Sequence, residues 1–294
     1  MPYFSKEFMD FILPFSLKKP ERQIRLKQGI LLIGSCFAEE IGARMGERRF
    51  KSLTNPHGIL YNPISLGQAI QEYILKKTYT EKDIFKTGEL WQSFSHHGRF
   101  SSPDEALCLK QINEEIETTH KELKNAGWLI ITFGSAFVYR YKKTDRFVGN
   151  CHRIPSGEFE KLLLSKEEII SEWQKQIDAL KKFNPQLSIL FTVSPVRYVR
   201  DGLIENNRSK GILLDAVHTL IEQNTNCSYF PAYEIVIDEL RDYRFYKEDL
   251  VHPNHLAINY VWEKFVANCC DENTQKFLAE YEPLLKGLRH RSLN

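Results

Sequence analysis

The chain has 294 residues, and 42% of them are hydrophobic, which is enough for one large core or two small ones. Its 40 basic residues nearly balance its 38 acidic residues, so no strong overall field attracts a nucleic acid or an anionic membrane. No stretch approaches the roughly 18 apolar residues of a membrane-spanning helix.

The cysteines and the N-terminus indicate the compartment. The sequence contains six cysteines and no CxxC pair, so a zinc ribbon and a thioredoxin motif are both excluded. Free thiols are typical of a reducing compartment. The first residues, MPYFSKEFMDFILPF, lack the basic region and the clean apolar run of a signal peptide. We therefore expect a cytoplasmic protein.

Short apolar runs that end in small residues predict buried parallel strands. They cover residues 30–33 before Gly34, 128–133 before Gly134, and 187–193 before Ser194. A further short strand is expected at residues 229–233.

Helical spacing of apolar residues predicts helices at residues 38–48, 165–183, 205–223 and 255–269. Ser165 followed by Glu168 predicts a capping box, and Asn206 is a candidate N-cap. Residues 50–110 look less regular, and we expect loops there.

Alternating strands and helices predict an α/β fold, a three-layer α/β/α sandwich with a mostly parallel sheet. No linker divides the chain, so we expect a single domain. Its core covers about residues 20–270, with an N-terminal arm (1–20) and a C-terminal tail (271–294).

Three segments follow the predicted strands directly: residues 34–36, Gly134-Ser135, and residues 194–197. Ligands bind outside the carboxyl ends of the strands in open parallel sheets. We therefore expect these segments to border one crevice.

The turn Gly34-Ser35-Cys36 places two nucleophilic residue types between a strand and a helix. The start of a helix offers N–H groups and a positive dipole end to a developing oxyanion, and it lowers the pKa of a thiol. Either Ser35 or Cys36 is thus a candidate nucleophile. The alternative is structural, with Ser35 capping the helix and Cys36 as a small buried residue.

Asp249 precedes His252 by three residues. A carboxylate at this spacing can bind Nδ1 of the imidazole, fix its tautomer and leave Nε2 to face a nucleophile. The alternative is a surface ion pair.

The run of residues 34–38 (GSCFA) resembles the signature of the GSCFA family, a set of bacterial proteins grouped with the SGNH/GDSL hydrolases. The resemblance covers about residues 20–270. It includes residues 57–63 (HGILYNP), 132–139 (TFGSAFVY), 149–152 (GNCH), 194–197 (SPVR), 205–210 (ENNRSK) and 248–253 (EDLVHP). These motifs are specific for the family and much less so for one reaction.

The resemblance implies an SGNH-hydrolase-like, flavodoxin-like fold and assigns roles to several residues. Cys36 falls on the nucleophile of the superfamily's Gly-Asp-Ser turn, with Ser35 as the alternative. Asp249 and His252 match its Asp-x-x-His, and Gly58 is the counterpart of its oxyanion glycine.

One superfamily block departs from the pattern. Gly134-Ser135-Ala136 lacks the asparagine of Gly-x-Asn, so the side-chain oxyanion donor is in doubt. Ser135 or Asn150 are the candidate substitutes.

Other polar residues are candidates for substrate binding. They are His57, His97, His152 and Arg197, each with a structural alternative. Four histidines (57, 97, 152 and 252) lack the spacing that argues for a metal site, so we predict no metal and no cofactor.

These patterns predict an acyl-ester or thioester hydrolase or acyltransferase. Its substrate would be a small molecule or a glycan, such as an O-acylated carbohydrate, with no nucleic-acid or membrane partner. The oligomeric state stays open. The alternative is a non-catalytic module that binds a glycan or acyl ligand on the same scaffold. No G-x-G-x-x-G follows the first strand, which disfavours a dinucleotide site.

Overall fold

A five-stranded parallel sheet forms the centre of the computed structural model, which describes residues 17–291. The strand order is β10-β9-β5-β1-β2. The strands are β1 (Gly29–Gly34), β2 (Lys51–Thr54), β5 (Ala126–Phe133), β9 (Ser188–Val193) and β10 (Cys227–Tyr229). In this doubly wound order the chain first adds β2 on one side of β1 and then adds β5 on the other side. In folds of this kind, ligands bind at the carboxyl ends of the strands where the order reverses, which here is between β1 and β5.

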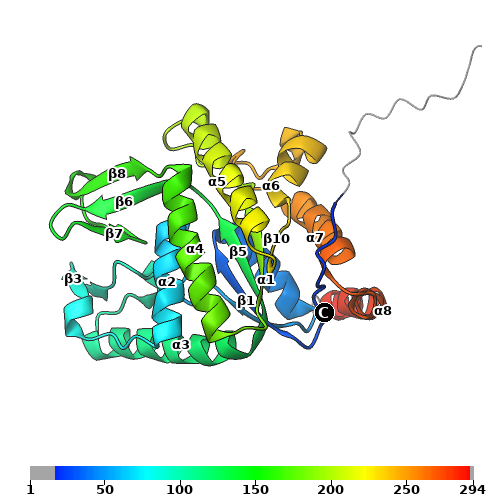
Figure 1. Cartoon of the computed structure of the whole chain (residues 1–294), viewed down its shortest axis with the longest axis horizontal. Coiled ribbons are helices and arrows are strands. Elements are labelled where there is room, and N and C mark those ends of the chain that lie inside the picture. The colour runs from blue at the N-terminus through cyan, green and yellow to red at the C-terminus, as the bar shows by residue number, and fades with distance from the viewer. Residues whose placement is uncertain (1–16, 292–294) are drawn as a thin grey trace, which may run out of the picture.

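Helices cover both faces of the sheet (Figure 1). Helices α1 (Cys36–Glu47) and α7 (His255–Cys269) pack on one face, and α2 (Pro63–Leu75), α4 (Lys166–Phe183) and α5 (Leu203–Gln223) pack on the other. The predicted three-layer α/β/α sandwich is thereby confirmed.

The alternation of side chains along β1 explains the two cores. Ile30 and Leu32 pack in the core with α1 and α7, whereas Leu31 and Ile33 pack in the core with α2, α4 and α5. Successive side chains of a strand point to opposite faces, so a strand buried on both faces is apolar throughout.

Several predicted boundaries shift in the structure. Helix α1 begins at Cys36, two residues early, and the strand expected at residues 229–233 is Cys227–Tyr229, followed by α6 (Ala232–Glu234). Asn206 was wrongly predicted as an N-cap: α5 begins after Gly202, and Asn206 Oδ1 accepts the Tyr198 N–H at 2.8 Å.

The prediction of loops at residues 50–110 was wrong in part. This region contains β2, α2, the η1 turn (Glu81–Asp83), the hairpin of β3 (Phe85–Thr87) and β4 (Leu90–Gln92), the η2 turn (Gly98–Phe100) and the start of α3 (Glu105–Asn125). Asn62 caps α2 by accepting the Ser65 N–H at 2.8 Å, and Pro63 occupies its first turn.

A second, antiparallel sheet follows β5. It has the order β7-β6-β8, from β6 (Phe137–Tyr141), β7 (Arg146–Val148) and β8 (Phe159–Leu163), with the η3 turn (Ser156–Glu158) before β8. In Figure 1 it lies at the end of the molecule opposite α7.

The C-terminal part contains further helical segments. The π-helical segment η4 (Ile235–Leu240) and the 3-10 turn η5 (Tyr243–Phe245) precede the Asp249–His252 segment, and α7 follows it. The predicted tail forms α8 (Glu272–Arg291). Most of the predicted N-terminal arm lies outside the described residues. No helix within residues 17–291 combines the length and apolar character needed to cross a membrane.

Burial of the central strand predicts a large loss of stability on truncation. Leu129 in β5 is fully buried, so Leu129→Ala is expected to lower the free energy of unfolding by about 2–5 kcal/mol, measured by urea titration. The matched control is Leu75→Ala, since Leu75 at the end of α2 is 73% exposed and should change stability by less than about 0.5 kcal/mol. Equal losses in the two variants would contradict this packing.

Candidate active site

The turn between β1 and α1 has little conformational freedom. Gly34 has φ +139°, and a Cβ added there would lie 2.2 Å from the Thr132 carbonyl oxygen of β5. Its N–H donates to Asn55 Oδ1 at 2.8 Å. Only glycine fits this close approach, and the turn is therefore fixed against the neighbouring strand.

Ser35 caps α1 and does not line the pocket described below. Its side chain is only 1% exposed, and its Oγ accepts the Phe37 N–H at 3.3 Å. These contacts support the structural alternative for Ser35, in which it caps the helix.

Cys36, the first residue of α1, is half-buried and lines a pocket of about 300 Å³. Asp249 and His252 line the same pocket, more than 200 residues further along the chain. The other lining residues are Phe37, Glu40, Val196, Lys247, Pro253 and Ile258.

Asp249 holds the imidazole of His252. Its Oδ2 lies 2.7 Å from His252 Nδ1, and its Oδ1 accepts the N–H groups of Val251 and His252 at 2.9 and 3.0 Å. With Nδ1–H donating to the carboxylate, Nε2 is the nitrogen left free to act as a base. Both side chains are about half-exposed, so water screens their attraction.

The N–H groups of His252 and Val251 are the largest causes that lower the pKa of Asp249, to about 2; the imidazole contributes as well. The carboxylate therefore stays ionised over the whole neutral range.

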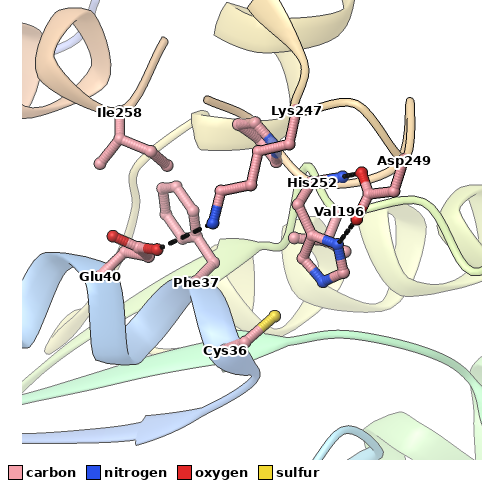
Figure 2. A pocket seen from close by; sticks show the side chains of 9 residues that line it. Cys36, Phe37, Glu40, Val196, Lys247, Asp249, His252 and Ile258 are labelled. Atoms are coloured by element: carbon pink, nitrogen blue, oxygen red, sulfur yellow. Dashed lines mark hydrogen bonds and ion pairs between the residues drawn. The ribbon is translucent and has the colours of Figure 1, made fainter. Parts of the chain in front are cut away.

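Cys36 and His252 approach the pocket from opposite sides. Figure 2 shows the Cys36 sulfur at the start of α1 directed toward the His252 ring on the loop before α7. No hydrogen bond joins the two among the described residues. Such contacts are often long in a ligand-free site and shorten when substrate binds.

The expectation of a lowered thiol pKa was wrong for Cys36. Burial raises the pKa of the thiol and outweighs the N–H groups of Phe37 and Cys36 itself, which lower it. The carboxylates of Glu39 and Glu40 raise it further. The helix start acts as predicted, but desolvation is the larger effect.

The backbone donors expected for an oxyanion are already engaged. Gly58 N–H donates to Asn55 O at 2.7 Å, and the N–H groups of Gly134 and Ser135 donate to Tyr61 O at 2.8 and 3.0 Å. Gly58 therefore does not present a free N–H to Cys36, contrary to the expectation.

Ser135 and Asn150 use their side chains locally. The Ser135 hydroxyl lies 3.3 Å from that of Ser209 and accepts the Phe137 N–H, and Asn150 Oδ1 accepts the His152 N–H at 2.8 Å. Neither side chain lines the Cys36 pocket.

The remaining candidates also have structural partners. His152 Nε2 lies 2.8 Å from Ser93 O, and His97 Nδ1 accepts the Arg99 N–H at 3.3 Å. Arg197 packs over Tyr246 with 4.4 Å from its guanidinium carbon to the ring centre. The backbone N–H of Arg197 donates to Val251 O at 3.3 Å, so Arg197 supports the loop that carries His252.

His57, Glu72 and His96 form the one group of metal-ligating residue types that converges within the described part of the chain. His57 Nε2 lies 2.7 Å from Glu72 Oε2, and the two imidazoles stack with centres 4.0 Å apart at 17°. The ligand atoms lie within 4.8 Å of one another, but the two rings are nearly parallel, so their in-plane lone pairs do not point at one shared ion. Glu72 also pairs with Lys77 at 3.1 Å. We interpret the group as a hydrogen-bonded support for residues 55–61.

Tyr61, Lys247 and Glu40 were not predicted as site residues. Tyr61 is half-exposed; burial raises the pKa of its hydroxyl, and the neighbouring Cys36 charge raises it further. Lys247 Nζ lies 3.6 Å from Glu40 Oε1 at the pocket. Tyr61 lies within the 57–63 motif, the one signal that could have identified it.

The comparison with protein families gives one match: the model of the GSCFA family covers residues 29–265. No curated protein matches the chain.

Two solved structures resemble the fold distantly. A carbohydrate esterase family 3 protein from Talaromyces cellulolyticus has 7% identity and a TM-score of 0.37, covering 88% of this chain and 99% of that one. An acetyl xylan esterase (Est2A) from the rumen bacterium Butyrivibrio proteoclasticus has 10% identity and a TM-score of 0.38, covering 84% of this chain and 64% of that one.

The contacts of Asp249 predict how its carboxyl group titrates. The pKa is expected at about 2 rather than near 3.8, as measured by NMR of the side-chain carboxyl carbon. In His252→Ala it should stay well below 3.8, because the two backbone N–H groups remain the larger causes. A return to 3.8 in that variant would show that the imidazole alone sets the shift.

Proposed function

The chain belongs to the GSCFA family, and we propose that it is an acyl-ester or thioester hydrolase or acyltransferase with Cys36 as nucleophile. The observation that supports this most is the convergence of Cys36, His252 and Asp249 on one pocket at the carboxyl edge of the sheet. Such an arrangement of a nucleophile, a base and an orienting carboxylate is the general requirement for covalent acyl transfer.

In the proposed reaction, His252 Nε2 accepts the Cys36 proton as the sulfur attacks the substrate carbonyl carbon. The tetrahedral intermediate collapses, the bond to the leaving oxygen or sulfur breaks, and His252 returns its proton to the leaving group. Water or an acceptor alcohol then attacks the acyl-cysteine, again losing its proton to His252, and frees Cys36. Asp249 stabilises the imidazolium in both halves.

A base within reach is essential here because burial keeps the Cys36 thiol protonated. A thiolate formed together with imidazolium is a strong nucleophile for activated acyl groups. Ser35 is the weaker candidate, since its buried hydroxyl is occupied as the helix cap.

For the oxyanion we assign the N–H of Cys36 at the start of α1, where the helix dipole adds to a single donor. The half-exposed hydroxyl of Tyr61 is a second donor within the electrostatic reach of Cys36. Phe37, Val196 and Ile258 provide apolar pocket walls. They suit a short acyl chain, and an O-acylated carbohydrate or a small acyl ester is the proposed substrate class.

A binding module on the same scaffold is the second candidate. It is favoured by the raised pKa of Cys36 and by the engaged N–H of Gly58. In this alternative the pocket holds a glycan or an acyl ligand without turning it over.

Turnover of short acyl esters and thioesters by matched variants tests the proposal. Cys36→Ala is expected to abolish turnover, and His252→Ala to lower kcat/KM by about 10²–10⁴-fold through loss of the base. Ser35→Ala should keep turnover but lose about 0.5–2 kcal/mol of stability with its cap.

The control is Cys151→Ala, which removes the other half-buried thiol outside the pocket and should leave turnover unchanged. A wild-type protein without turnover that still binds such ligands would support the binding module. Turnover that survives Cys36→Ala but not Ser35→Ala would transfer the nucleophilic role to Ser35.

A further inference from the structure

A cluster of aromatic and charged side chains lies beside the Cys36 pocket and has no part in the proposed reaction. Tyr139 and Lys161 are paired across β6 and β8. Tyr198 and Asp201 follow β9 in the chain. The hydroxyl oxygens of Tyr139 and Tyr198 lie 3.2 Å apart, and Lys161 Nζ forms an ion pair with Asp201. The cluster thus joins the small antiparallel sheet to the segment between β9 and α5.

The ammonium of Lys161 lies over three aromatic rings. Its Nζ is 4.3 Å from the ring centre of Phe137, 5.0 Å from that of Tyr198 and 5.8 Å from that of Tyr139. Because side chains alternate along a strand, Phe137 and Tyr139 lie on the face of β6 opposite to the buried Val138. All three aromatic side chains are half-buried, so the cluster is accessible from the surface.

The strand end after β9 leads from the Cys36 pocket directly into this cluster. Val196 lines the pocket, and Tyr198 is two residues further along the chain. Two residues span at most about 7 Å, so the Cα atoms of Val196 and Tyr198 are no farther apart than this. The Tyr198 N–H donates to Asn206 Oδ1 at 2.8 Å, which holds the segment on α5.

Tyr61 extends the aromatic surface toward Cys36. Its side chain is 48% exposed, and a Cβ added to Gly134 would lie 3.2 Å from the Tyr61 ring and 3.3 Å from Ser35 Cβ. The ring and the Cys36 turn therefore pack against the same point of the backbone. Burial raises the pKa of the Tyr61 hydroxyl, and charges on Cys36 and Tyr198 raise it further, so the hydroxyl is within electrostatic reach of both.

The aromatic rings and hydroxyl groups of the cluster fit a sugar. A sugar ring presents C–H groups on its faces and hydroxyl groups around its rim. Its faces can pack on the electron-rich faces of aromatic rings such as those of Tyr139 and Tyr198. The hydrogen bond between these two tyrosines uses one of their two hydroxyl hydrogens and leaves the other for a ligand.

The charges of the cluster favour a neutral sugar. The side chains of Lys161 and Asp201 are 25% and 30% exposed, so each has a solvent-facing side from which it can form a charge-assisted hydrogen bond to a sugar hydroxyl. The pair has no net charge, and the neighbouring Arg200 is exposed, so water and salt screen its field. An anionic ligand therefore gains little at this position.

We propose that Tyr139, Tyr198 and Lys161 form a subsite that binds one neutral sugar ring, while the acyl group of the same substrate lies in the Cys36 pocket. The inference rests on the proposed function in treating that pocket as the place of the acyl group. It narrows the substrate class to an O-acylated carbohydrate and assigns the residues that select it.

Binding of sugars without an acyl group tests the subsite without any reaction. The full chain is titrated with the methyl β-glycosides of glucose, galactose, xylose and N-acetylglucosamine, and binding is followed by saturation-transfer NMR. We expect at least one glycoside to bind. Tyr198→Ala should then weaken its affinity about tenfold through loss of the stacked ring. Tyr198→Phe, which keeps the ring, should weaken it less.

Tyr243→Ala is the matched control for these titrations. Tyr243 is 56% exposed, and it lies outside the cluster on the segment before the Asp249–His252 loop. This variant should bind the glycoside as wild type does. If Tyr198→Ala does not fold, Lys161→Met changes the subsite from β8 instead and should also weaken binding about tenfold.

Four outcomes would overturn the inference. They are no binding of any glycoside to the wild type, wild-type affinity in folded variants of Tyr198 and Lys161, an equal loss in Tyr243→Ala, and tighter binding of glucose 6-phosphate than of the neutral glucoside. The last result would identify an anion site.

Turnover separates the subsite from the proposed function. Ethyl acetate carries the acyl group without a sugar, and the monoacetate of the bound glycoside carries both. The loss in Tyr198→Ala should be about tenfold larger for the monoacetate than for ethyl acetate and should appear in KM. Sugar binding without turnover of either ester leaves the subsite standing and removes the proposed reaction. Turnover of both esters with equal losses in Tyr198→Ala does the reverse.

Discussion

The hydrogen bonding at the carboxyl ends of β1, β5 and β9 determines where the turn that carries Cys36 lies. The pairing continues past the strands: Ser35 N–H donates to Thr132 O at 3.2 Å, and Ser194 N–H donates to Phe133 O at 2.8 Å. The turn that carries Cys36 is therefore part of the sheet. A side chain at Gly34 would force the two strands apart, which couples the proposed nucleophile to the most buried layer of the fold.

The two halves of the site differ in how firmly they are held. Cys36 is fixed by the sheet, whereas Asp249 and His252 lie on an exposed loop whose anchors are Arg197, Lys247 and Asn254. Lys247 N–H donates to His252 O at 2.7 Å, and Asn254 Nδ2 donates to Arg244 O at 2.7 Å. Both side chains are about half-exposed, so in the proposed reaction we expect movement of this loop, rather than of α1, to bring the imidazole to the sulfur.

The predictable part of the fold is the part governed by local periodicity. The apolar runs of β1, β5 and β9 follow from burial on both faces of the sheet. The helical spacing at residues 255–269 follows from burial of one face of the helix. Helix α2 was missed although Asn62-Pro63 is a normal helix start, because its flanking loops are rich in polar and aromatic residues. The pairing of Cys36 with Asp249 and His252 was expected from the family resemblance. The engaged N–H of Gly58 and the local contact of Asn150 Oδ1, which accepts the His152 N–H, depend on backbone geometry that spacing does not encode.

Charge balance at Cys36 is a tertiary property as well, and it reverses the expectation based on the helix start alone. Two N–H groups favour the thiolate, but burial and two carboxylates of α1 oppose it. Lys247 offsets one of those carboxylates at 3.6 Å. A thiol that stays protonated until a base acts on it is protected from adventitious oxidation and alkylation, because these reactions need the thiolate. The same burial that raises its pKa thus makes the proposed reaction depend on His252 as the base.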